Sequence, residues 1–231
     1  MRNKVAIAGA QELTRGNAPF DNDEYDIWSF ADWICYDWLE RCSGIFEIHE
    51  PKVYMNHPRT PQYWDKLQEI EIPVYMYPVA DPRIPEAVLY PMDDVLKLIS
   101  KGKQFGEPFK LLNCSLTYAM ALAILYGYEV IDVYGAELAG ASAYLRQAPS
   151  FAFWNGLALG HGIELNINCS KGMFVQDIYG FEDNLPEMLI HQYIDKIQEQ
   201  QRDLENTMWM TKGAMQLAED LLKRGRNDKT D

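Results

Sequence analysis

The sequence lacks the features of membrane and secreted proteins. No apolar run approaches the ~20 residues that a membrane-spanning helix needs, and the N-terminus has no continuous hydrophobic segment of the signal-peptide type. Cysteine is scarce as well: the chain has 4 cysteines, without a C-x-x-C pair or a zinc-ligand spacing. We therefore expect a cytoplasmic protein without membrane contact, whose thiols are reduced and mostly buried.

Positive charge is also in short supply. The 21 lysine and arginine residues are outnumbered by 34 aspartate and glutamate residues, which gives a formal net charge of −13. A surface this acidic repels a phosphate backbone, so we do not expect a nucleic-acid partner.

What the sequence does have is a regular alternation of short apolar runs with helical patterns. Its 231 residues, 48% of them hydrophobic, suffice for one α/β domain and an appendage. Strands are predicted at residues 4–9, 25–30, 44–49, 72–77, 130–134 and 163–167, and helices near residues 33–42, 61–69, 92–100, 116–126 and 151–159. This order predicts an α/β, Rossmann-like domain over residues 1–180, with a mostly parallel sheet and helices on both faces.

In such a sheet, ligands bind beyond the carboxyl ends of the strands. This rule selects one rim of the sheet, made of residues 9–14, 31–32, 49–50, 77–81 and 137–147. The first strand ends at Gly9, but Ala10 and Gln11 follow where a dinucleotide fingerprint has further glycines. A standard NAD site is therefore not expected, and the residues name no other cofactor.

The segment 112–138 combines polar residues with two element ends. Asn113 and Ser115 precede an apolar helical run that Gly127 closes, and Glu137 follows the next strand. Ser115 can cap the helix, whose free N–H groups and positive dipole end form a site for phosphate or carboxylate. The alternative is that Ser115 only caps a core helix.

Two further clusters are candidates for chemistry. Glu47 and His49 lie two apart on a strand and so share one face, where His49 can act as a general base or serve as a structural histidine. Their spacing to Glu50 and His57 is not that of a zinc site, and we expect no metal.

The second cluster is the predicted loop 144–147, with Tyr144, Arg146 and Gln147, followed by Trp154. An aromatic face, a guanidinium and an amide beyond a strand favour a specificity loop. The alternative is that these side chains pack a helix start.

The segments VAIAGA, DIWSFADW, IFEIHEP and SLTYAMALAILYGYEVIDVYGAEL carry a family resemblance. Together they resemble the Rossmann-like domain of bacterial CMP-sialic-acid-dependent sialyltransferases, archaeal 6-hydroxymethylpterin pyrophosphokinase and the motility accessory factor glycosyltransferases. Phage proteins of unassigned function carry similar sequences, and this chain resembles a phage-type member. The resemblance covers roughly residues 3–175 and implies fold more specifically than reaction.

The resemblance implies a nucleotide site at the strand ends. Gly9 matches the sialyltransferase pattern, whereas Ala10, Gln11 and Ala31 replace the residues that hold cytidine in that family. Ser115 matches a serine that contacts the nucleotide phosphate. The family's catalytic His-Ser pair has no counterpart, because His161 lies in a Gly-His-Gly turn.

After Gly180 the sequence turns into one long helical pattern. From Pro186 on, positions spaced alternately by four and three form a heptad seam of Ile190, Ile194, Ile197, Gln201, Leu204, Met208, Thr211, Met215, Ala218 and Leu222. We expect residues 181–231 to form a helical arm with a disordered tail that makes the protein a homo-oligomer. The alternative is a hairpin that turns near Gly213.

The leading prediction is a nucleotide-sugar-dependent, glycosyltransferase-like protein. Ser115 would hold the donor phosphate and His49 or Glu137 would act as base. The residues predicted to bind the ligand are Gly9, Gln11, Asp32, Asn113, Ser115, Tyr144, Arg146, Gln147 and Trp154. Two alternatives remain: a non-catalytic protein that sequesters a nucleotide-derived molecule, and an ATP-dependent diphosphokinase whose magnesium is held by carboxylates such as Asp32 and Glu137.

Overall fold

The computed structural model describes residues 2–136, 142–169 and 185–227, and within them the side chains of 2–136, 147–169 and 194–216. Glu137 and residues 228–231 lie outside this part. The disordered tail was predicted over residues 224–231, and its first four residues are instead the end of a helix. The chain divides into two compact units, Met1–Phe174 and Val175–Asp231. The first unit holds the sheet and the second holds one long helix.

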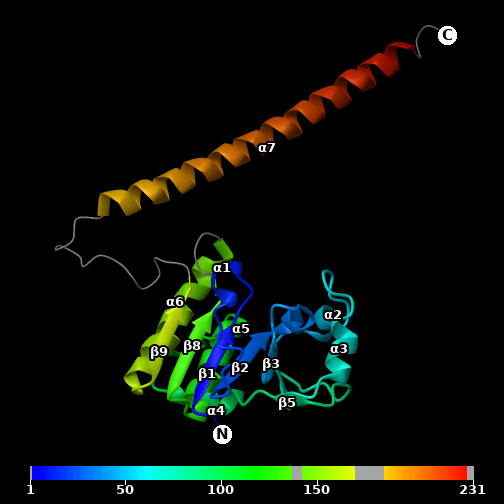
Figure 1. The fold of residues 1–231 in the computed structure, drawn as a ribbon. Helices are drawn as coiled ribbons and strands as arrows, with labels where there is room; N and C mark the ends of the chain where they lie inside the picture. Colours follow the sequence, from blue (N-terminus) through cyan, green and yellow to red (C-terminus); the bar gives the residue numbers. More distant parts are fainter. Residues whose placement is uncertain (1, 137–141, 170–184, 228–231) are drawn as a thin grey trace. The chain divides into compact units, whose positions relative to one another are not determined.

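The first unit is built on a seven-stranded sheet in the order β5-β4-β3-β2-β1-β8-β9, in which each strand pairs in parallel with its neighbours. Its strands are β1 (Lys4–Ala8), β2 (Tyr25–Phe30), β3 (Gly44–Glu47), β4 (Val74–Met76), β5 (Ala87–Leu89), β8 (Val130–Tyr134) and β9 (Glu164–Asn168). Figure 1 shows these strands side by side, with β1 between β2 and β8. The predicted α/β, Rossmann-like fold is confirmed.

Helices cover both faces of this sheet. They are α1 (Glu12–Arg15), the 3-10 helix η1 (Ala31–Cys35), α2 (Pro51–Tyr54), α3 (Tyr63–Glu69), α4 (Met92–Leu98), α5 (Ser115–Tyr126) and α6 (Ser142–Gly160). A small antiparallel hairpin of β6 (Lys103–Gln104) and β7 (Glu107–Pro108) precedes α5.

The inner strands β1 and β3 are apolar on both sides, which is why both faces are covered. Along β1, Val5 and Ile7 pack in the cluster that contains α4, α5 and α6, whereas Ala6 and Ala8 pack in another cluster with Phe20 and Ile27. In β3, Phe46 joins the first cluster, while its neighbour Ile45 packs with α2 and α3. Alternate residues of a strand therefore face opposite layers.

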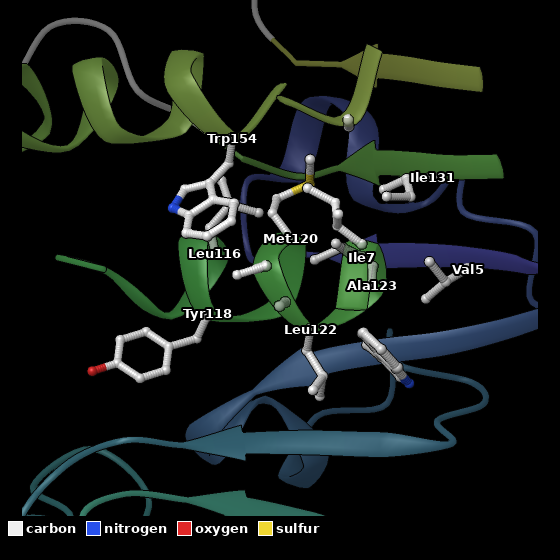
Figure 2. Packing of buried hydrophobic residues seen from close by; sticks show 14 of the residues in the cluster. Val5, Ile7, Leu116, Tyr118, Met120, Leu122, Ala123, Ile131 and Trp154 are labelled. Carbon is white, nitrogen blue, oxygen red and sulfur yellow. The ribbon is translucent and has the colours of Figure 1, made fainter. Parts of the chain in front are cut away.

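The helix α5 is the centre of the larger cluster. Its residues from Leu116 to Ile124 are all buried, as expected for a helix that is apolar on every side. Figure 2 shows Leu116 and Met120 of α5 among Ile7 of the sheet and Trp154 of α6. Gly127 ends the helix in a left-handed conformation with φ of +73°.

The sheet reverses its strand order between β1 and β8, and two glycines lie at that point. The Gly9 N–H donates to Tyr134 O at 2.8 Å, and the Gln11 N–H donates to Gly135 O at 2.9 Å. A Cβ atom at Gly9 would collide with the Gly135 carbonyl. Gly9 is therefore required by the close approach of two strand ends.

Two element predictions are wrong, and one strand was missed. The helix predicted at 33–42 is only η1, because the chain then extends and the Arg41 guanidinium donates to Asn22 O at 2.7 Å and to Phe20 O at 2.9 Å. The predicted loop 144–147 lies inside α6, which continues through Pro149, a residue that is rare inside helices. The edge strand β5 was not predicted, because it has three residues and is partly exposed.

The second unit contains α7 (Leu185–Asn227), a single helix of 43 residues. Figure 1 shows it running without interruption, and it stays helical through Gly213. The predicted hairpin is therefore wrong and the long helix is confirmed. None of the described helices is both long enough and apolar enough to cross a membrane.

Candidate functional site

A cavity of about 550 Å³ lies at the carboxyl ends of β1, β2, β3 and β8. This is the position where ligands bind in open parallel sheets, beside the reversal of strand order. It is lined by six of the predicted site residues: Gly9, Gln11, Asp32, His49, Ser115 and Gln147.

One wall of the cavity holds His49 and a carboxylate behind it. Glu47 ends β3 and its side chain is 1% exposed, whereas the His49 side chain is 49% exposed. Glu47 Oε1 lies 2.7 Å from His49 Nδ1 and accepts the His49 backbone N–H at 2.9 Å. Its other oxygen, Oε2, accepts the hydroxyl of buried Tyr63 at 2.8 Å. The Glu47 carboxylate thus fixes the ring by Nδ1 and leaves Nε2 for other partners.

The same contact changes the acidity of the histidine. The hydrogen bond to Glu47 raises the pKa of His49 above its ordinary 6.5, while partial burial acts in the opposite direction. Burial, together with the charge of Glu47, raises the pKa of Tyr63 well above 10 and keeps that hydroxyl a donor.

A second wall holds Asp32 and His57. Asp32 follows β2 in η1, is 1% exposed and accepts the Thr60 hydroxyl at 2.6 Å. His57 Nδ1 lies 3.4 Å from Asp32 Oδ2, and the His57 side chain is 10% exposed. The residue before Asp32, Ala31, has a φ of +45°, a conformation that is strained for a residue with a side chain. Strain of this kind is common at functional sites.

Two more side chains line this wall. Arg59 lies with its guanidinium carbon 5.6 Å from the centre of the Trp33 ring, and both residues line the cavity. His57, Arg59 and Trp33 were not among the predicted site residues. The polar run His57-Pro58-Arg59-Thr60 was the feature of the sequence that could have suggested these residues. The contact of His57 with Asp32, however, depends on tertiary structure.

The third wall is the N-terminus of α5. The N-cap is Cys114, with φ of −157° and ψ of 157°, so the prediction that Ser115 caps the helix is wrong. Thr117 closes the turn: its hydroxyl donates to Cys114 O at 2.7 Å and lies 3.4 Å from the Cys114 N–H. Ser115 is the first helical residue and lines the cavity with Leu116. First-turn N–H groups have no partner inside a helix, and they favour an anion.

The charge around the cavity differs from that of the whole chain. Among the described lining residues, Asp32 is the only acid, whereas His49, His57 and Arg59 can all carry positive charge. In a chain of net charge −13, the described lining is therefore less acidic than the chain as a whole.

Two polar atoms of the lining residues are left unsatisfied. Gln11 Oε1 and His57 Nδ1 are buried, and neither makes a hydrogen bond in the described part of the chain, although His57 Nδ1 lies within ion-pair distance of Asp32 Oδ2, at 3.4 Å. Because such atoms destabilise a fold by about 1–3 kcal/mol each, they favour a bound group that supplies the missing hydrogen bonds.

The remaining predicted residues do not all join the cavity. Trp154 is 0% exposed and donates from Nε1 to Leu111 O at 2.6 Å, which makes it a core residue and corrects its assignment as a ligand-binding one. Asn113 lies one residue before the N-cap and is not among the lining residues. The side chains of Glu137, Tyr144 and Arg146 lie outside the described part, so their roles remain predictions.

Metal ligation was tested on the same residues. Within residues 2–136, 147–169 and 194–216, no group of three histidine, cysteine, aspartate or glutamate side chains could hold a metal ion.

No protein-family model matches this chain, and neither does any curated protein. Similar solved structures are sialyltransferases of Campylobacter jejuni. One, in complex with cytidine-5'-monophosphate, is 19% identical, with 74% of this chain and 81% of that chain covered and a TM-score of 0.44. Another, a monofunctional alpha-2,3-sialyltransferase, is 14% identical, with 86% and 95% covered and a TM-score of 0.45. These similarities are too distant to assign roles to residues, and a phage-type identity and kinship with the other two families remain predictions.

Proposed function

We propose that this protein binds a nucleotide-activated sugar in the cavity and transfers the glycosyl group to an acceptor hydroxyl. The observation that carries the proposal is the meeting, in one cavity, of the α5 N-terminus with a histidine that a buried carboxylate holds by Nδ1. The α5 N-terminus can bind the phosphate of the leaving nucleotide, and the histidine can take the proton that the acceptor hydroxyl loses.

The donor phosphate belongs at the N-terminus of α5. The backbone N–H groups of Ser115 and Leu116 and the helix dipole favour the negative charge that grows on the phosphate as the bond to the sugar breaks. Arg59, which also lines the cavity, adds positive charge to the lining.

The acceptor is activated by His49. Nε2 of the neutral ring takes the hydroxyl proton as the acceptor oxygen bonds to the sugar carbon, and the nucleotide leaves with the electron pair of the broken C–O bond. The resulting imidazolium is stabilised by Glu47 at 2.7 Å from Nδ1. Because Glu47 raises the pKa of His49, we expect the transfer rate to rise with pH through that pKa.

Binding is tested by replacing Ser115 with an acid. Aspartate at the first position of a helix complements the dipole, so Ser115→Asp should leave thermal stability unchanged or higher. The same charge repels a phosphate, so the affinity for CMP, UDP, ADP or GDP in a calorimetric screen should fall at least tenfold, a loss of only about 1.4 kcal/mol. Ser100→Asp, on an exposed turn, is the matched control. Equal nucleotide affinity for wild type and Ser115→Asp would contradict the phosphate site.

Transfer is tested with the sugar derivatives of whichever nucleotide binds. His49→Ala should lower the rate of sugar transfer or donor hydrolysis by about 10²–10⁴-fold, the usual contribution of a general base, with little change in nucleotide affinity. His161→Ala, on the exposed turn after α6, is the control. Binding without any turnover by the wild-type protein would leave a binding function and overturn the transfer proposal.

A further inference from the structure

The helix α7 presents an apolar face with no partner among the described residues. Ile194, Ile197, Leu204, Met208 and Met215 occupy successive heptad positions and are 42%, 47%, 70%, 48% and 61% exposed. The sequence continues this pattern to Ile190 on one side and to Ala218 and Leu222 on the other. We call this face the α7 seam.

The first unit is too small to cover the seam. At about 1.5 Å per residue, the 43 residues of α7 extend over about 65 Å, and residues 190–222 over about 50 Å. A globular unit of this chain's first 174 residues is about 40 Å across. Part of the seam would stay exposed in any packing of one chain on itself.

A membrane surface also fits poorly. Helices that lie on membranes carry a lysine- and arginine-rich polar face, whereas α7 has seven acidic and six basic residues. A seam with a 3.5-residue period matches best a second helix of the same period.

The two polar residues of the seam can be buried in such a pair. The Thr211 hydroxyl donates to Thr207 O at 2.8 Å, so its donor is satisfied within its own helix. Gln201 Nε2 donates to Glu205 Oε1 at 3.1 Å. A single polar residue at such a position fixes the register of a coiled coil.

The flanking charges distinguish the two orientations. An antiparallel pair with full overlap of residues 190–222 has its midpoint at residue 206, which brings the two Glu205 side chains, each one residue from that midpoint, near each other across the seam. In a parallel pair, Glu205 faces Gln200 and Lys212 faces Thr207, without repulsion. We propose that α7 pairs with the α7 of a second copy of this chain as a parallel, in-register, two-stranded coiled coil.

The oligomeric state is tested with two matched substitutions on the full chain. Leu204 in the seam and Met210 outside it are both 70% exposed in the single chain. The wild type and Met210→Lys should have twice the mass of one chain in light scattering at tens of micromolar. Leu204→Lys should have the mass of one chain, with its sheet intact by circular dichroism. A monomeric wild type, or equal dissociation by both substitutions, would overturn the proposal.

The orientation is tested by disulfide trapping. Ile197→Cys should cross-link to itself on mild oxidation, because residues 197 of the two copies meet only in a parallel pair. Glu199→Cys, on the opposite face of the helix, should not cross-link, and the wild type with its own four cysteines is the background. Cross-linking only when Ile197→Cys is combined with Met215→Cys would show an antiparallel pair and contradict the proposed orientation.

Discussion

Glu47 and Asp32 are buried carboxylates that each lie behind a histidine of the cavity. Ion pairs of this kind stabilise little by themselves, because removing two charges from water is unfavourable. Their value at a binding site is that a fixed acid sets the tautomer and the direction of a ring. Glu47 does this for His49 through two contacts of one oxygen, to the ring and to the backbone.

The pairing of Glu47 with His49 makes stability depend on pH. The folded-state pKa of His49 is raised above 6.5, so the pair stabilises the fold fully below about pH 6.5 and loses this contribution as pH rises through the folded-state value. In urea unfolding, the difference in free energy between wild type and His49→Gln should therefore be larger at pH 5.5 than at pH 9. His161→Gln is the control, because it shows how much the same substitution changes the free energy of unfolding at a histidine outside the cavity. A difference that grows with pH would contradict this pairing.

Single residues were predicted well where chain position alone decides their place. Gly9 and His49 end or follow strands, and such residues reach the rim of a parallel sheet whatever else the fold does. Asp32 and His57 are far apart in sequence, and only the packing of η1 against the turn after α2 brings them together. Trp154 is an aromatic residue of the kind that stacks on ligands, but its position in α6 directs its side chain into the core.

At the scale of elements, the start of α5 connects stability and binding through two neighbouring residues. Thr117 is fully buried and closes the first turn, whereas Ser115 faces the cavity. The sequence pattern assigned both capping and ligand binding to Ser115, the first hydroxyl before the apolar run. In the structure, Thr117 closes the turn and Ser115 lines the cavity.

This division predicts opposite results for two substitutions in α5. Thr117→Val should destabilise the protein by about 0.5–2 kcal/mol, the usual effect of losing a cap, and leave nucleotide affinity unchanged in the folded protein. Ser115→Ala should weaken nucleotide binding with a smaller loss of stability. Chemical denaturation and calorimetry on both variants measure the two quantities. If Ser115→Ala proves the more destabilising, Ser115 rather than Thr117 closes the turn.

Elements with strong apolar runs that stop at polar residues or at glycine were predicted within a residue. The strands β1, β2 and β8 belong to this class, because buried parallel strands are apolar on both faces. The segment 36–43 was not: its aromatic and apolar residues have a helical spacing, but it begins with a bend and a turn, and Arg41 donates to the carbonyls of Phe20 and Asn22. Only tertiary contacts decide between the two conformations.

At the scale of the whole molecule, the cavity belongs to one of the two units. All its described lining residues lie between Gly9 and Gln147, within the unit Met1–Phe174. A chain that ends at residue 174 should therefore bind nucleotide with the affinity of the full chain, as measured by calorimetry, and should have the mass of one chain in light scattering. Loss of binding by this folded fragment would mean that the second unit contributes to the site.

The position of β1 in the sheet has a consequence for folding during synthesis on the ribosome. β1 pairs on one side with β2, which is made soon afterwards, but its other edge waits for β8, where Lys4 meets Val130. Until residue 134 has emerged, β1, whose last four residues are buried in the folded protein, has an open edge, and the β8 side of the cavity is missing. Contacts of such long range close slowly, and an apolar open edge is prone to pair with a neighbouring chain. Nascent chains stalled before β8 should therefore bind a chaperone that captures apolar strands, and release it once β8 is complete.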